Sequence, residues 1–264
     1  MEQPSSPGTR PVELRDCIEE LMKFTLQAYT DQTLGLDLHL SKDFCFQLLN
    51  DSYHSDSEQA LPQSLYQRLA SILCEFITYG SFSETTMFME SYNLDNDLRE
   101  RGKWDKLILD EGTQLLNILK SVNFEIDVQE PFFTQLRDGL KTVEGRCAVG
   151  DYNQIESGAL ILFNKCLVLQ VQDIHRYASF AEMLEAESLE KVLPGVKTID
   201  EGVKVYRKFY TEAKERANGV LAICVAKSSA QPYIPLAGIL SGLSYKGIAN
   251  YLGQHYFPGT IPGK

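Results

Sequence analysis

The spacing of apolar residues changes at about Val122, and this change limits the folds open to the chain. Before it, apolar residues recur in steps of three and four, as in Leu14, Cys17 and Leu21, which is the period of an amphipathic helix. From Val122 to Val128 apolar and polar residues alternate, which is the period of a half-buried strand. The sequence therefore predicts a helical N-terminal half followed by a half that contains β-strands.

The N-terminal half is predicted to form a five-helix bundle. After the first helix, Ser41 is expected to cap a second. Pro62 is expected to open a third that ends near Gly80, and Ser83 a short fourth. The fifth helix is expected over Trp104–Leu119, with Trp104 packed at a helix interface.

The second half combines strands with helices, which predicts an α+β fold with an antiparallel sheet. The expected elements are a strand over 122–128, a short helix from Pro131 ended by Gly139, strands over 143–149, 159–163, 167–174 and 220–226, one or two helices over 179–193 and one long helix from Thr198 to about Ala217. Residues 231–264 suit a packed helix, although their glycines weaken that pattern. We expect a disordered tail over 1–12, an acidic helical domain over 13–121 and a β-barrel domain with a C-terminal extension over 122–264.

The net negative charge of the chain comes entirely from the first half. Residues 1–125 carry 10 Lys and Arg against 21 Asp and Glu, a net charge of −11, whereas residues 126–264 carry 15 of each. Nucleic-acid binders gain affinity when Lys and Arg replace counterions, so any nucleic acid is expected at a local site in the second half. The acidic half either keeps the chain dissolved or docks a protein partner.

Cysteines and histidines form no metal or disulfide pattern in the sequence. The six cysteines and four histidines are scattered, without a C-x-x-C pair. No apolar stretch of membrane-spanning length occurs. We therefore expect no metal, no cofactor and no membrane contact, and a reducing compartment, either cytoplasm or nucleus.

One octapeptide concentrates charge at the start of a predicted strand. Residues 139–146 read G-x-K-x-x-E-x-R, with Gly139, Lys141, Glu144 and Arg146 at the fixed positions. Alternate strand residues share a face, so Glu144 and Arg146 point to one side, and Lys141 lies within reach at the turn. Such a cluster can hold a polar ligand or an anion through charged hydrogen bonds. It can equally be an ion network that is satisfied by its own members and only closes the barrel.

This octapeptide, in its setting, resembles the signature of ASCH domains, named for activating signal cointegrator homology. The resemblance extends from about residue 126 to 227, through Glu130–Phe133 upstream and Tyr177–Phe180, Val192–Gly195 and Gly219–Ile223 downstream. It implies a six-stranded PUA-like barrel in which Gly139, Lys141, Glu144 and Arg146 line a cleft. The family roles it implies are RNA or nucleotide binding, transcription coactivation and, in small bacterial members, hydrolysis of N4-acetylcytidine.

Departures from the hydrolytic members favour binding over catalysis. Those members look as if they use the motif lysine, a threonine three residues later and a glutamate just before the second helix. Here Lys141 is present, but Glu144 replaces the threonine, and residues 193–197 contain no carboxylate. We expect an RNA- or nucleotide-binding module. The alternatives are an amidohydrolase that uses Lys141 and Glu144, and a scaffold without ligand.

Further candidate contacts lie on the helix after Thr198 and at Tyr177, before the helices predicted over 179–193. Lys204, Arg207 and Lys208 form a basic strip that either meets phosphates or faces solvent. Tyr177, Tyr206 and Tyr210 are candidates for stacking on a base, with core packing the expected use of at least two of them.

Overall fold

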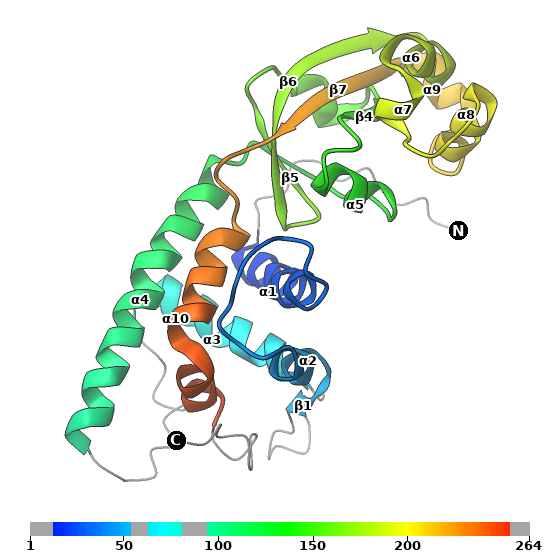
Figure 1. Ribbon diagram of the computed structural model, residues 1–264. Helices are drawn as coiled ribbons and strands as arrows, with labels where there is room; N and C mark the ends of the chain where they lie inside the picture. Colours follow the sequence, from blue (N-terminus) through cyan, green and yellow to red (C-terminus); the bar gives the residue numbers. More distant parts are fainter. Residues whose placement is uncertain (1–12, 54–62, 81–93, 254–264) are drawn as a thin grey trace. The chain divides into compact units, whose positions relative to one another are not determined.

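The computed structural model describes residues 13–53, 63–80 and 94–253. The chain divides into two compact units (Figure 1): Ser121–Gln231, called here the sheet unit, and Glu13–Lys120 together with Pro232–Lys264, called here the helical unit. The helical unit therefore includes the C-terminal segment, which was predicted from the sequence to belong to the barrel domain. The predicted tail over 1–12, the helix start at Pro62 and the short helix at Ser83 lie outside the described residues.

The first helices of the helical unit follow the predicted capping signals. Their bounds are α1 Leu14–Thr30, α2 Lys42–Asn50, α3 Leu65–Tyr79 and α4 Leu94–Ser121, with a two-strand pair, β1 Ser52–Tyr53 and β2 Gln63–Ser64, before α3. The Ser41 hydroxyl accepts a hydrogen bond from Phe44 N (3.1 Å) at the start of α2, and Gly80 ends α3 in the left-handed conformation (φ 73°). A capping box of Ser64 and Gln67 begins α3 at Leu65.

The long helices α4 and α10 pack against each other at Trp104. Helix α10, Tyr233–Leu252, contains the apolar residues that suggested a packed helix, and they are buried. Trp104 lies 6.4 Å from the ring of Tyr251 and against Gly247, so it packs at a helix interface as predicted. Helix α10 is interrupted at Ser244, whose backbone (φ 54°, ψ −175°) is not helical.

The sheet unit contains a curled five-stranded sheet, so the half-barrel seen in the described residues has five strands and not the six expected. The strands are β3 Phe124–Ile126, β4 Val143–Cys147, β5 Leu160–Phe163, β6 Leu167–Tyr177 and β7 Val220–Lys227, in the order β3-β5-β6-β7-β4. Strand β3 runs parallel to β5, whereas the other pairs are antiparallel. The expected antiparallel pairing thus holds for three of the four strand pairs, whereas β3 is parallel to β5, which it reaches through a crossover that includes α5 and β4.

Helices α6 to α9 connect β6 to β7 and lie beside the end of β6 and the start of β7 (Figure 1). Their bounds are α6 Phe180–Glu187, α7 Leu189–Val192, α8 Ile199–Arg207 and α9 Glu212–Asn218, while α5 Phe132–Arg137 and a 3₁₀ turn, Gly150–Gln154, flank β4. The single long helix predicted from Thr198 is two helices. Helix α8 ends at Arg207, and Thr211 caps α9 by accepting a hydrogen bond from Lys214 N (3.2 Å).

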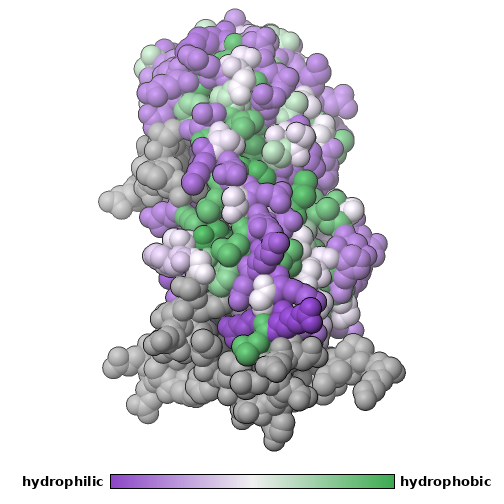
Figure 2. Space-filling view, turned by 90° about the vertical axis from the view of Figure 1, so that its left-hand side faces the viewer, coloured by the Kyte–Doolittle hydropathy of each residue, from purple (hydrophilic) through white to green (hydrophobic). Residues whose placement is uncertain are grey.

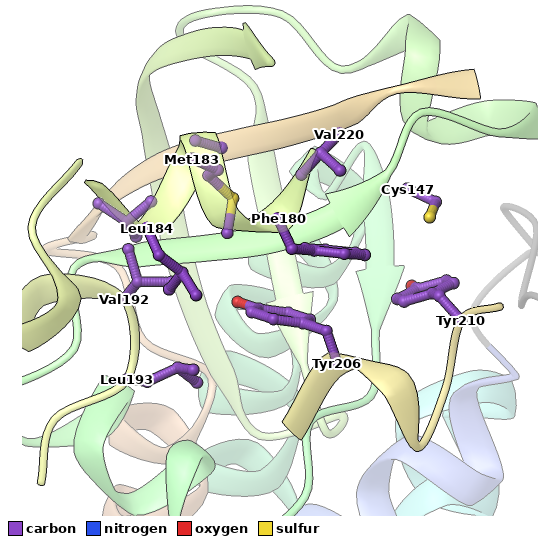
Figure 3. Packing of buried hydrophobic residues seen from close by; sticks show 11 residues of the cluster. Cys147, Phe180, Met183, Leu184, Val192, Leu193, Tyr206, Tyr210 and Val220 are labelled. Carbon is purple, nitrogen blue, oxygen red and sulfur yellow. The ribbon is translucent and has the colours of Figure 1, made fainter. Parts of the chain in front are cut away.

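The core on one face of this sheet is built around Phe180 (Figure 3). Its ring stacks on Tyr206 at 4.1 Å between centroids and 8° between planes, and on Tyr210 at 5.5 Å. The other members of this core come from β4, β7, α6 and the segment after it: Val143, Cys147, Met183, Leu184, Val192, Leu193, Val220 and Ala222. The buried aromatic stack fixes α6 and α8 against the sheet.

All six cysteines lie within the described residues and none forms a disulfide bond; Cys17, Cys45, Cys147 and Cys166 are buried. Buried in this way, these four cysteines act as small apolar residues. Within the described ranges, no helix combines the length and the apolar character that crossing a membrane requires.

Two glycines of α4 allow the helical packing to be tested. A methyl group at exposed Gly102 would meet nothing within 4 Å, whereas one at Gly112 would lie 2.5 Å from Cγ1 and 3.3 Å from Cγ2 of Ile77. We expect Gly102→Ala to raise the free energy of unfolding by about 0.5–1 kcal/mol, because alanine favours the helix.

We expect Gly112→Ala to lower the free energy of unfolding by about 1–3 kcal/mol, because the added methyl group overpacks the contact with α3. Urea denaturation of both variants measures the difference. Equal shifts of the same sign would contradict the packing of α4 on Ile77.

Candidate functional site

The turn between α5 and β4 positions the charged cluster. Gly139 adopts φ +74°, a conformation that favours glycine, and ends α5 as predicted. The Gln135 carbonyl then accepts hydrogen bonds from Leu140 N (2.9 Å) and Lys141 N (3.0 Å). These bonds turn the Lys141 side chain into the unit and leave Gly139 exposed at the surface.

Lys141 is buried, with 2% of the residue exposed, and its ammonium group has an acceptor for each of its three hydrogens. Its Nζ donates to the carbonyl oxygens of Val143 (2.7 Å) and Val192, and forms an ion pair with Glu144 Oε2 at 3.2 Å. An ammonium group has three hydrogens to donate, so these three acceptors satisfy it. Burial lowers the pKa of Lys141, and the neighbouring Glu144 opposes that shift only in part.

Glu144 lies between two cations. Its Oε1 is 2.9 Å from Arg146 Nε, while Oε2 faces Lys141, and only 6% of the residue is exposed. Burial alone would raise the pKa of the Glu144 carboxyl, but the charges of Lys141 and Arg146 outweigh it and lower the pKa. Glu144 therefore stays ionised and holds both cations in place.

Arg146 connects the two edges of the sheet. Its Nη2 donates to the carbonyl oxygen of Asp127 (2.8 Å), the residue directly after edge strand β3, while Arg146 itself belongs to the other edge strand, β4. Its Cζ lies 5.8 Å from the ring centre of Tyr152, and its guanidinium contacts the Tyr210 hydroxyl. With 15% of its side chain exposed, Arg146 is the most accessible of the three charged side chains.

The structure therefore brings together all three charged residues that the sequence singled out. Glu144 and Arg146 share a face, as the alternation predicted, and Lys141 reaches them from the turn. The aromatic ring of Tyr152 beside Arg146 was not identified from the sequence, because it comes from a 3₁₀ turn without a periodic pattern.

The tyrosine candidates have different surroundings. Tyr206 and Tyr210 are buried in the Phe180 stack, so they follow the expected core use and do not present their rings to a base. Tyr177 is half-buried and donates to Glu187 Oε1 (2.6 Å).

The basic strip on α8 is only partly open. Arg207 forms an ion pair with the buried Glu215, whose Oε1 accepts a hydrogen bond from Phe180 N (2.6 Å). Arg207 thus helps to fix the start of α6. Lys204 and Lys208 are exposed and remain candidates for phosphate contacts.

The stability of the sheet unit should depend on the Glu144 charge more than on that of Lys141. Glu144→Gln leaves two cations facing each other in a buried site, so we expect the free energy of unfolding to fall by about 3–5 kcal/mol. Lys141→Met leaves Glu144 paired with Arg146, so we expect a smaller loss.

Chemical denaturation at neutral pH measures both variants, with exposed Glu190→Gln as a control that should change stability by less than about 0.5 kcal/mol. A Glu144→Gln variant as stable as this control would show that the ion network does not support the fold.

Comparisons with known proteins identify the region that carries the site. A model of the ASCH domain family matches residues 126–229. Two solved structures are 44% identical in sequence: the crystal structure of hypothetical protein PH0355, covering 40% of this chain and 98% of that one (TM-score 0.39), and the solution NMR structure of protein PF0455 from Pyrococcus furiosus, covering 40% and 97% (TM-score 0.37). No curated protein matches. Through residues 126–229, the chain belongs to the ASCH domain family.

Proposed function

We propose that the ASCH region binds RNA or a nucleotide-sized ligand beside β4, with Arg146 as its central contact. The observation that carries this proposal is the fixed guanidinium of Arg146, which is held by Glu144 and Asp127 and retains partial exposure. A guanidinium group suits phosphates and base edges, because it presents planar donors in a fixed geometry. Lys141 and Glu144 act as positioning residues in this arrangement.

Exposed lysines on α8 supply the electrostatic part of the proposal. Lys204 and Lys208 place two exposed positive charges on α8 of the sheet unit. Residues 126–264 as a whole carry no net charge, whereas residues 1–125 carry −11. On the face shown in Figure 2, which is the left-hand side of Figure 1, hydrophilic residues are interspersed with groups of hydrophobic ones. Exposed lysines such as Lys204 and Lys208 favour a ligand that carries phosphate groups, because each phosphate contact adds affinity.

The acidic helical unit is proposed to contact another protein rather than nucleic acid. Its negative charge disfavours phosphates. It also exposes two aromatic side chains, Phe46 (64%) and Tyr79 (77%), and aromatic residues are enriched in protein interfaces.

Hydrolysis of an acylated nucleoside receives less support. Burial lowers the pKa of Lys141, which would suit a base. However, its three hydrogens are donated to Val143, Val192 and Glu144, and the side chain is 1% exposed. We expect no cytidine when the purified protein is incubated with N4-acetylcytidine. Cytidine formed by the wild type and lost in Lys141→Ala would favour the amidohydrolase instead.

RNA binding can be tested by titrating the full chain with short single-stranded RNAs at low salt, where phosphate contacts are strongest. We expect Arg146→Lys, which keeps the charge but loses the planar donors, to weaken binding about tenfold, equivalent to about 1.4 kcal/mol. Lys204→Gln and Lys208→Gln should each reduce the slope of log affinity against log salt by about 0.7.

Lys120→Gln, at an exposed lysine of the helical unit, serves as the matched control and should leave affinity and slope unchanged. Absence of binding at low salt would reject the proposal and leave the scaffold alternative, in which the ion network only closes the half-barrel.

A further inference from the structure

A second polar cluster lies on the face of the sheet opposite Glu144 and Arg146. Strand partners share a face, and the register pairs Asp173 with Cys224 and His175 with Ala222. Glu144 and Arg146 pair instead with the intervening residues of β7, Ile223 and Leu221. The cluster is therefore separate from the site proposed for RNA.

Helix α6 adds a carboxylate to this face. The helix begins three residues after the end of β6 and packs against β4, β6 and β7. Its last residue, Glu187, thereby reaches both strands. Glu187 Oε1 lies 2.5 Å from His175 Nδ1, and Glu187 Oε2 lies 3.9 Å from Cys224 Sγ.

We propose that His175, Glu187 and Cys224 bind one divalent transition-metal ion, with zinc as the best match. One ligand atom from each of the three residues lies within 4.8 Å of the other two. Imidazole nitrogen, carboxylate oxygen and thiolate sulfur are the ligands that zinc uses, at about 2.0–2.3 Å. Two such ligands around a tetrahedral ion lie about 3.4–3.6 Å apart, as follows from those bond lengths.

The three ligand atoms lie within 4.8 Å of one another, so side-chain shifts of about 1 Å would bring them to that geometry. The Sγ–Oε2 separation of 3.9 Å is already close to it. The contact between His175 Nδ1 and Glu187 Oε1, at 2.5 Å, would have to open by about 1 Å to admit an ion. Glu187 ends its helix, and rotation of its side chain can supply this change.

The surroundings of His175 match those of a metal ligand. Its second nitrogen, Nε2, lies 3.1 Å from Asp173 Oδ2, and metal-bound histidines commonly donate their other N–H to a carboxylate, which fixes the ring. A hydrogen-bond network without metal would account for Asp173, His175 and Tyr177. Cys224 packs against the Phe180 core and donates only a long, weak hydrogen bond to Glu187 (3.9 Å), so its sulfur can instead serve as a metal ligand once deprotonated.

Metal binding here would replace protons with the ion. The Cys224 thiol loses its proton to solvent as the sulfur–metal bond forms, and His175 binds through the neutral ring. Three protein ligands leave a fourth position for water. Because the ligands come from β6, α6 and β7, the ion would also pin α6 to the sheet.

Cobalt titration of the reduced, chelator-treated full chain tests this proposal. A cobalt–thiolate bond produces near-ultraviolet charge-transfer absorption, so we expect this band to saturate at one ion per chain and to disappear when zinc displaces cobalt. Cys224→Ser should abolish the band. Cys224→Ser and His175→Gln should each weaken zinc binding by about 100-fold or more, and Asp173→Asn by about 10-fold.

Two controls match the ligand types. Cys74→Ser removes another half-buried thiol, and His39→Gln removes another histidine paired with an aspartate; both should retain the band and the affinity. Far-ultraviolet circular dichroism confirms that each variant is folded. If Cys224→Ser is unfolded, His175→Gln, whose side chain is 43% exposed, supplies the same comparison. Absence of a thiolate band in the wild type, or equal zinc binding by the wild type and His175→Gln, would overturn the proposal.

Discussion

The buried ion network of Lys141, Glu144 and Arg146 is the interaction on which the sheet unit depends. Removing charges from water is costly, and the cost is offset only when every charge has a partner. Here Glu144 faces both cations, Lys141 also donates to Val143 and Val192, and Arg146 also donates to Asp127. Through these bonds the network holds α7 against β4 and links the two edge strands.

This division of tasks limits what the site can do. Lys141 and Glu144 use their polar atoms on one another and on the backbone, so they can position a neighbour more readily than they can receive a ligand. Arg146 combines fixed placement with partial exposure. The octapeptide can therefore serve both purposes, because Lys141 and Glu144 can stabilise the fold while Arg146 contacts a ligand.

The sequence predicted the charged cluster because the signal for it is local. Gly139, Lys141, Glu144 and Arg146 lie within eight residues, and strand alternation alone places two of them together. The cluster of His175, Glu187 and Cys224 could not be found this way. Its members are separated by 12 and 37 residues along the chain, and no spacing rule connects two strands through a helix that returns over them.

The sequence by itself determined the elements whose causes lie within a few residues: the helical stripes, the caps at Ser41 and Gly80, and the strand that begins after Gly139. Only the tertiary structure decided which of these elements meet. It assigned α10 to the helical unit, made β3 parallel to β5, and buried Lys141 against the carbonyl oxygen of Val192. The physical reason is that period and capping depend on neighbours in the chain, whereas burial and pairing depend on surfaces brought together by folding.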